Sequence, residues 1–422
     1  MARAAAISRP LAAVSLTRQR VIGVFLVLLS LAGWFAFGRT TDPAAIAKYG
    51  LTPGGAETRL PDWELPARTA IGVLALVGAV VGGVQLARGF GRGTNAVLGI
   101  VAAFFIFSFL TWATAGKSLN LAGLIASTLV RAVPITLGAL SGVLCERAGV
   151  VNIAIEGMML AGAFAGALVG SLTHSLWIGL LASVLVGALL ALIHGILSIK
   201  YKTNQIVSGT VINIFATGLT SYLSAKVLSN YQELNNPGIF KFWPIPGLSE
   251  IPFLGEILFN QNMFFYALFV FLVVLQLALF YTRWGLRLRA VGEHPKAADT
   301  LGINVFRTRY MAVILGGMMA GFGGGYFTLG SVGRFDELMT AGRGFIGLAA
   351  MIFGNWTPFG SYGAGLLFGF ADSLASKLAI LGVAIPSQLF LMAPYLATMI
   401  ILAGVVGRGQ MPAADGQPYE KE

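Results

Sequence analysis

Charged side chains are scarce in this sequence, and that scarcity sets the first limit on what the protein can be. Only 11% of the 422 residues are Asp, Glu, Lys or Arg, whereas a soluble globular domain carries roughly 25%. The chain therefore has too little charge to cover a water-facing surface, which excludes an ordinary cytosolic enzyme. Its hydrophobic share of 56% also excludes a disordered or fibrous protein.

The residues that carry most catalytic and metal chemistry are also sparse. Cys145 is the single cysteine, which excludes a disulfide scaffold, and the three histidines are scattered without a second ligand at metal spacing. The sequence contains no HExxH and no GxSxG. The stretch 111–118 imitates the end of a phosphate-binding loop but lacks its first glycine and a preceding buried strand. We therefore predict that the chain is not an enzyme and holds no metal, so any energy source must be a partner or an ion gradient.

Long apolar runs are what the sequence has in abundance. A bilayer core of about 30 Å requires roughly 20 apolar residues in one helix. Such runs predict membrane-spanning helices at 21–38, 69–87, 95–115, 121–144, 152–171, 176–198, 205–229, 263–281, 309–330, 361–381 and 388–407. A shorter run, 343–356, is either a steep short span or a re-entrant half-helix. The sequence thus predicts an all-α integral membrane protein, a polytopic helical bundle of about 11–12 transmembrane helices.

Positive charge lies in alternate loops between these runs. The segments with an excess of Lys and Arg are 1–20, 88–94, 199–204 and 282–308. Cytoplasmic loops are enriched in these two residues, so we expect the N-terminus and loop 282–308 in the cytoplasm. With twelve spans the C-terminus is cytoplasmic too. The net charge of +11 follows from this topology and does not indicate nucleic-acid binding.

Glycine is abundant inside the apolar runs. Gly162, Gly166 and Gly170 are four residues apart, and so are the members of a second set: Gly317, Gly321 and Gly325. In lipid, small residues at this spacing let helix backbones approach closely. The spacing predicts tightly packed helices, and it is also compatible with a narrow path whose walls rearrange.

Polar residues inside the apolar runs are informative exceptions, because an ionisable side chain at mid-membrane costs a few kcal/mol or more. Our candidates for a translocation path are Asn152, Glu156, Asn213 and Asp372. Glu156 either closes hydrogen bonds at a broken helix end or lines the path. For Asn213 a hydrogen bond between helices is the simpler expectation. Three charged residues are expected to reach the membrane interfaces: Glu146, Arg147 and Lys377.

Loop 282–308 contains the pattern of a short helix. Pro295 suits a first helical turn, helix formers follow it, and Gly302 is placed to end the helix. This predicts a short amphipathic helix along the membrane, with a small apolar face formed by Ala297, Ala298 and Leu301. A helix of this length is not stable alone, so it binds either lipid or a protein. Small alanines fit a protein groove better than lipid, and we expect a protein partner.

Three stretches resemble the signatures of one family. They are 146–159 (ERAGVVNIAIEGMM), 290–303 (AVGEHPKAADTLGI) and 341–356 (AGRGFIGLAAMIFGNW), the last followed by Pro358, Gly360 and Gly365. They resemble permease subunits of bacterial ABC importers of the branched-chain amino acid, ribose and nucleoside group. The likeness covers about 120–407, and the first stretch is most similar to one of the two permeases of nucleoside importers.

The resemblance implies a function and an organisation. It implies a permease that carries nucleosides across the bacterial plasma (inner) membrane by alternating access. The implied core is 116–407, preceded by an N-terminal extension, 1–115, with three transmembrane helices and followed by a cytoplasmic tail, 408–422. Simple sugars such as ribose and branched-chain amino acids are alternative substrates. A more distant alternative is an ion-coupled secondary transporter, for which Glu156 and Asp372 are the only plausible carboxylate pair.

The resemblance also implies partners. They are a second homologous permease, an extracytoplasmic substrate-binding protein, membrane lipids and a cytoplasmic ABC ATPase that itself holds ATP and Mg, so that this chain binds no cofactor. The family's coupling-helix loop, which docks into the ATPase, matches a set of residues here: Glu293, His294, Pro295, Lys296, Ala297, Ala298, Asp299, Leu301 and Gly302.

Overall fold

The structure, a computed structural model, describes residues 16–54, 59–383 and 410–421, together with single residues between 386 and 395. The predicted crossing 388–407 lies mostly outside the described residues. The chain divides into two compact units. Unit 1 consists of Met1–Gly123 with Lys377–Ala384, and unit 2 consists of Leu124–Ser376 with Ile385–Glu422.

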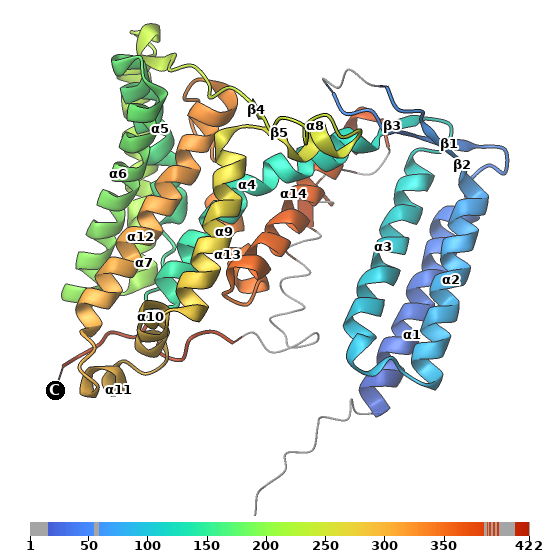
Figure 1. Cartoon of the computed structure of the whole chain (residues 1–422), viewed down its shortest axis with the longest axis horizontal. Helices are drawn as coiled ribbons and strands as arrows, with labels where there is room; N and C mark the ends of the chain where they lie inside the picture. The colour runs from blue at the N-terminus through green and yellow to red at the C-terminus, as the bar shows by residue number, and fades with distance from the viewer. Residues whose placement is uncertain are drawn as a thin grey trace, which may run out of the picture. The chain divides into compact units, whose positions relative to one another are not determined.

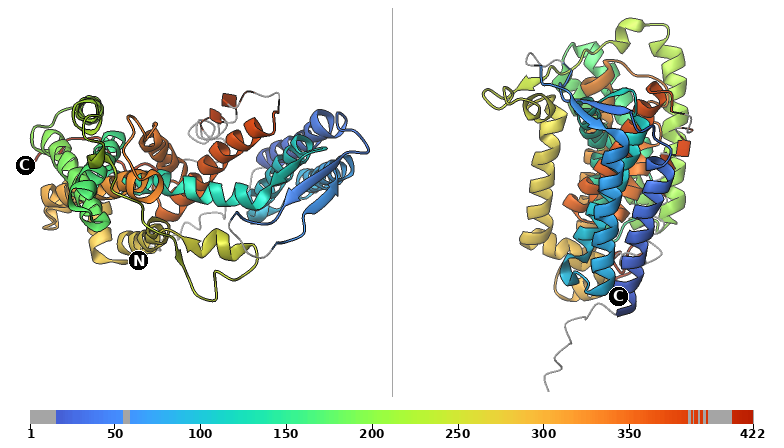
Figure 2. Two further views of the ribbon diagram at one scale, coloured as in Figure 1. Left: turned by 90° about the horizontal axis from the view of Figure 1, so that it is seen from above. Right: turned by 90° about the vertical axis from the view of Figure 1, so that its right-hand side faces the viewer.

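Unit 1 consists of three helices that run side by side and a small sheet at one end of them (Figures 1 and 2). The helices are α1 (Leu16–Gly33), α2 (Ala67–Ala87) and α3 (Thr94–Ala113), and the strands are β1 (Ile46–Gly50), β2 (Trp63–Pro66) and β3 (Ser118–Asn120). Strand β1 lies between the other two, antiparallel to β2 and parallel to β3. Glycines bring α2 close to α1, because a Cβ at Gly82 would lie 2.8 Å from the Val27 backbone nitrogen.

Unit 2 is a bundle of helices. Its long helices are α4 (Leu121–Glu146, of which the first three residues belong to unit 1), α5 (Ile155–Thr173), α6 (Leu176–Gly195), α7 (Gln205–Leu223), α9 (Met263–Tyr281), α12 (Val305–Gly325) and α14 (Pro358–Ile380, of which the last four residues belong to unit 1). Its shorter elements are β4 (Trp243–Pro244), α8 (Leu254–Leu258), β5 (Asn260–Gln261), α10 (Arg283–Glu293), α11 (Pro295–Thr300) and α13 (Arg343–Phe353). π-helical turns extend several helices, and the longest of these, Tyr326–Val332, follows α12.

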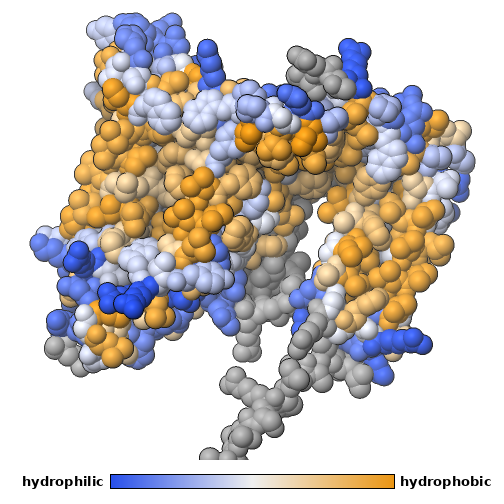
Figure 3. All heavy atoms as spheres, in the orientation of Figure 1, coloured by the Kyte–Doolittle hydropathy of each residue, from blue (hydrophilic) through white to orange (hydrophobic). Residues whose placement is uncertain are grey.

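The described residues contain ten helices long and apolar enough to cross a membrane. They coincide with the predicted crossings from 21–38 to 361–381, which are therefore confirmed as helices. Helix α13 has 11 residues and rises about 16 Å at 1.5 Å per residue. It is therefore too short to span the bilayer core by itself. In Figure 3, apolar residues cover the middle of the visible helices in each unit, and hydrophilic residues gather at the helix ends.

The centre of unit 2 is the packing of α12 against α5 and α6. A Cβ at Gly321 would collide with the Ser183 carbonyl in α6 and lie 3.1 Å from the Val184 Cα, and a Cβ at Gly162 in α5 would lie 2.9 Å from the Gly321 carbonyl oxygen. The glycines at four-residue spacing thus allow the close helix contacts that the sequence predicts.

The two ends of unit 2 differ. One end carries α10 and α11, and we call it the α11 end (Figure 1). The opposite end carries β4, β5 and α8, and we call it the α8 end. The segment 230–262 at the α8 end contains the β4–β5 pair and α8. Unexpectedly, residues 283–293 of the α11 end form helix α10 as well.

Candidate functional site

An interrupted crossing runs through unit 2. After the π-helical turn, residues 333–342 form irregular turns, and only then does α13 begin. The irregular part starts at the α8 end, where the Phe335 N–H donates to Asn235 Oδ1 at 2.7 Å. The crossing finishes at the α11 end, where the Trp356 indole N–H donates to Glu146 Oε2 at 2.6 Å. Residues 343–356 were expected to be either a steep short span or a re-entrant half-helix. In the structure they follow the irregular residues 333–342, and the two stretches together run from the α8 end to the α11 end, with only α13 helical.

Glu156 caps the half-helix where it begins. Its carboxylate accepts hydrogen bonds from the Thr340 hydroxyl (2.7 Å), from the Gly342 N–H (2.8 Å) and from the Gly344 N–H (2.6 Å). Gly342 has φ +77°, a conformation that side chains disfavour. The first N–H groups of a helix have no partner within the helix, and a negative charge there also meets the positive end of the helix dipole. Of the two roles considered for Glu156, the structure shows capping, although the capped helix is α13, not a break in its own.

Three charged side chains meet beside this cap. Asp372 of α14 lies 2.7 Å from Arg131 of α4 and 3.6 Å from Arg343, the first residue of α13. Their side chains are 28%, 33% and 26% exposed in the isolated chain. Charged groups inside a membrane bundle usually pair and face its interior or a water-filled cavity. We call Arg131, Arg343 and Asp372, with Glu156, the charged cluster.

The other two path candidates are packed inside the bundle. Asn152 is fully buried, and its Oδ1 accepts from the Ala154 N–H at 3.1 Å. Asn213 of α7 accepts from the Gly157 N–H of α5 at 2.7 Å and donates to the Ile153 carbonyl at 2.9 Å. The expected interhelical hydrogen bond of Asn213 is thus confirmed, whereas neither amide faces an open surface.

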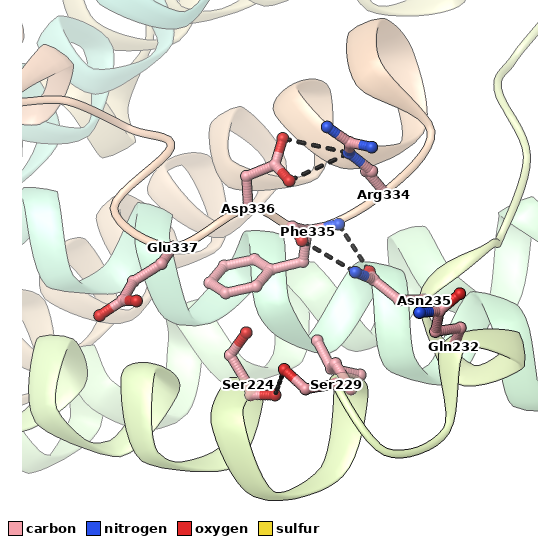
Figure 4. A pocket seen from close by; sticks show the side chains of 9 residues that line it. Ser224, Ser229, Gln232, Asn235, Arg334, Phe335, Asp336 and Glu337 are labelled. Carbon is pink, nitrogen blue, oxygen red and sulfur yellow. Dashed lines mark hydrogen bonds and ion pairs between the residues drawn. The ribbon is translucent and has the colours of Figure 1, made fainter.

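A polar pocket lies at the α8 end, next to the start of the interrupted crossing (Figure 4). Its volume is about 530 Å³, and residues 224–235 and 334–337 line it. Arg334 and Asp336 form an ion pair at 3.0 Å. The Asn235 side-chain amide donates to the Phe335 carbonyl and accepts from the Phe335 N–H. No hydrogen bond in the described structure engages the Glu337 carboxylate, and Figure 4 shows it pointing away from the Arg334–Asp336 pair. The charged and amide groups that line the pocket can bind a polar ligand.

The short helix predicted in loop 282–308 is present as α11. Pro295 occupies its first turn, the His294 ring nitrogen accepts from the Ala297 N–H at 3.1 Å, and Gly302 follows with φ +79°. Lys296 and Asp299 belong to the same helix, and Glu293 ends α10.

The predicted small face of α11 is wrong in one respect. Ala298 is only 2% exposed and packs inside this chain, against Val291 and Val305, whereas Leu301 is 81% exposed. Ala297 is exposed as well. Helical periodicity predicts which residues share a face of α11, but it does not predict which face packs against the rest of the chain.

The expectation that Glu146 reaches a membrane interface is also wrong. Its side chain is buried, accepts the indole N–H of Trp356 and lies beside Asp415. Arg147 next to it donates to the Trp356 carbonyl at 2.8 Å. The partners come from residues more than 200 positions later in the chain, so local hydropathy gave no sign of them.

Comparisons with known proteins agree with this architecture. The sequence profile described as "Branched-chain amino acid transport system / permease component" matches residues 124–406. The chain belongs to this family. The resemblance read from 146–159, 290–303 and 341–356 is therefore confirmed, and the chain is a multi-pass membrane permease component and not itself an enzyme.

Among curated relatives, the guanosine ABC transporter permease protein NupQ of Bacillus subtilis is 42% identical over 307 residues, covering 71% of this chain and 96% of the relative. The nucleoside ABC transporter permease protein NupC of Lactococcus lactis subsp. cremoris is 40% identical over 309 residues, with the same coverage. The putative glucose ABC transporter permease protein TsgC13 of Haloferax volcanii is 31% identical over 328 residues, covering 71% of this chain and 98% of the relative. No solved structure matches the chain.

Proposed function

We propose that this chain is the membrane-spanning permease subunit of an ATP-driven ABC importer of nucleosides. The observation that carries the proposal is its 42% and 40% identity to permease proteins of guanosine and nucleoside transporters, over 71% of its length. Simple sugars are the second candidate, because a glucose permease protein is 31% identical over a similar length. In this proposal 116–407 form the permease core, 1–115 an N-terminal extension and 408–422 a tail.

The charged cluster supports a path beside the interrupted crossing. Glu156 and Asp372, with Arg131 and Arg343, are partly exposed at the depth where α13 begins. A nucleoside is neutral and rich in hydrogen-bonding groups, so it needs polar partners and no net countercharge. The cluster contains two arginines and two acids, and offers such partners with balanced charge. Alternating access then exposes the charged cluster first toward the α8 end and then toward the α11 end.

The partners follow from what the chain has and lacks. Its sequence has no complete nucleotide-binding loop, so ATP and Mg belong to a separate ATPase. Basic residues concentrate in the loops of the α11 end, which we place in the cytoplasm against that ATPase. The binding protein then delivers its solute at the α8 end, and a second permease covers the partly exposed charged cluster.

Uptake by the reconstituted complex tests the function directly. Proteoliposomes that contain this chain with its second permease, ATPase and binding protein should accumulate labelled guanosine only when ATP is supplied to the ATPase. Unlabelled nucleosides should compete, whereas ribose and leucine should not. Competition by ribose alone would move the assignment to sugars. Accumulation driven by a proton or sodium gradient without ATP would overturn the ABC assignment.

Leu301, which directly follows α11, is the residue most suited to test docking on the ATPase. Because its side chain is 81% exposed, Leu301→Glu should leave folding and membrane insertion unchanged. A central apolar anchor of an interface typically contributes about 2 kcal/mol or more, so ATP-driven uptake should fall by more than about tenfold. Uptake and co-purification of the ATPase are the measurements.

Leu301→Met is the matched control and should retain uptake, since it keeps the apolar contact. Unchanged uptake in Leu301→Glu would show that α11 does not dock through this residue. Substitution of Ala298 cannot serve the same purpose, because the buried methyl group packs inside this chain and a charged replacement would disturb the fold itself.

A further inference from the structure

The C-terminal tail, residues 410–421, binds along the α11 end of unit 2. The Ala414 N–H donates to the Gly292 carbonyl of α10 at 2.9 Å, and the Ala413 N–H donates to Glu293 Oε2 at 3.2 Å. Arg309 of α12 donates to the Gln417 carbonyl at 2.9 Å. The tail therefore joins α10 to α12, the two helices that flank α11.

A side chain of the tail also belongs to the buried cluster against which α11 packs; we call this cluster the seat of α11. Tyr419 is 5% exposed and packs in one cluster with Val291 of α10, Ala298 of α11 and Val305 of α12. Its ring lies 5.4 Å from the ring of Phe306. Since Ala298 is the buried residue of α11, the face of α11 that holds it to the bundle belongs to the same cluster as Tyr419 of the tail.

Ion pairs at the surface add to these contacts. Glu420 lies 2.5 Å from Lys202, which follows α6, and Lys421 lies 3.9 Å from Asp299 of α11. Exposed pairs of this kind contribute little, about 0–1 kcal/mol. The buried Tyr419 and the backbone hydrogen bonds are therefore the main attachments of the tail.

We infer that the tail positions α11: by adding Tyr419 to the cluster in which Ala298 is buried, it holds the helix rigidly to α10 and α12, so that a push on α11 moves the membrane helices. This inference rests on the proposed function, which assigns α11 to the ATPase. A helix of six residues has little stability of its own. If α11 were not packed firmly, it would shift by itself when the ATPase pushes on it. The membrane helices would then move less, and less solute would be transported per ATP hydrolysed.

Asp415 makes the seating of the tail dependent on pH. Asp415 is 9% exposed, and burial raises the pKa of its carboxyl from 3.8 to about 7, although Glu146 and Arg309 act in the opposite direction. The titratable and charged groups around it are Cys145 and Glu146 of α4, Glu293 of α10, Arg309 of α12 and Tyr419 of the tail. The seated tail thus binds a proton more tightly than a free tail. Seating is strongest below about pH 4 and weakens as the pH rises to about 7.

Spin-label mobility tests the positioning in the intact permease. Thr300 of α11 is exposed, and a label on Thr300→Cys is selective because Cys145 is buried. Tyr419→Ala should raise the mobility of this label, and Tyr419→Phe should keep it low because the ring remains. Glu420→Ala is the control in the same tail and should change nothing, since that pair is exposed.

The second measurement is the amount of nucleoside imported per ATP hydrolysed by the full complex without a label. Tyr419→Ala should lower this ratio by about fivefold or more, with hydrolysis retained, and Tyr419→Phe should restore it. If Tyr419→Ala does not accumulate in the membrane, Tyr419→Leu, which removes the ring but keeps an apolar side chain in the cluster, provides the same comparison.

Unchanged label mobility in Tyr419→Ala would overturn the inference, and so would higher mobility with an unchanged import ratio. Failure of the wild-type complex to import any nucleoside would instead count against the proposed function. In that case the label at residue 300 still decides whether the tail holds α11.

Discussion

Replacing Glu156 with alanine should strongly destabilise unit 2 and abolish uptake. The substitution removes the acceptor for the Thr340 hydroxyl and for the Gly342 and Gly344 N–H groups. A buried N–H left without a partner costs about 1–3 kcal/mol, and hydrogen bonds to a charged group are among the stronger ones. We therefore expect a loss of at least about 3 kcal/mol, seen as a lower midpoint of thermal unfolding in detergent.

Two other substitutions make this result specific. Glu156→Gln keeps one acceptor oxygen, so its unfolding midpoint should lie between those of the wild type and Glu156→Ala. Glu233→Ala removes an acid that is exposed at the α8 end and should have almost no effect. Equal midpoints for Glu156→Ala and Glu233→Ala would mean that the cap of α13 does not stabilise the fold.

Gly321→Leu should prevent unit 2 from folding. A Cβ at this position would collide with the Ser183 carbonyl and lie 3.1 Å from the Val184 Cα. Both are backbone atoms of α6, so no side-chain rotation can make room. Overpacking typically costs about 1–3 kcal/mol where the surroundings can adjust, and the cost here should exceed that range. The yield of monodisperse protein on size-exclusion chromatography measures the outcome.

Gly218→Leu is the matched control for this substitution. Gly218 lies in α7, also a membrane-spanning helix, and a Cβ there would meet nothing within 4 Å. The same change of residue should therefore leave the yield near that of the wild type. A normal yield for Gly321→Leu would show that α6 and α12 do not pack as closely as described.

The sequence predicts the features that depend on local pattern. Apolar runs identify the membrane helices because each run must by itself cover the bilayer core. The four-residue spacing of Gly162 and Gly321 with their neighbours predicts close packing. Pro295 and Gly302 mark the two ends of α11 because each acts on the backbone beside it.

Features that depend on distant parts of the chain were beyond sequence reasoning. Glu156 meets its partners across 184 to 188 positions, so the sequence could only offer capping and path-lining as alternatives. Arg343 joins Asp372 in the charged cluster, yet it begins the short run 343–356, which is separate from the run 361–381 that contains Asp372. Ala298 is buried in a cluster that includes Tyr419, more than a hundred residues away. In each case hydropathy and spacing describe a single segment, whereas the role of the residue comes from a contact between two distant segments.

The half-helical crossing has a consequence for leakage. A continuous apolar helix blocks small ions along its whole length, because its backbone groups are all paired and its surface repels water. The irregular turns of 333–342 lie at the start of α13, beside partly exposed charged groups, and water reaches such a place more easily. The barrier to protons and sodium at this crossing therefore depends on the side chains that pack against residues 333–342. A substitution that loosens them should dissipate the membrane potential before it impairs delivery of the solute.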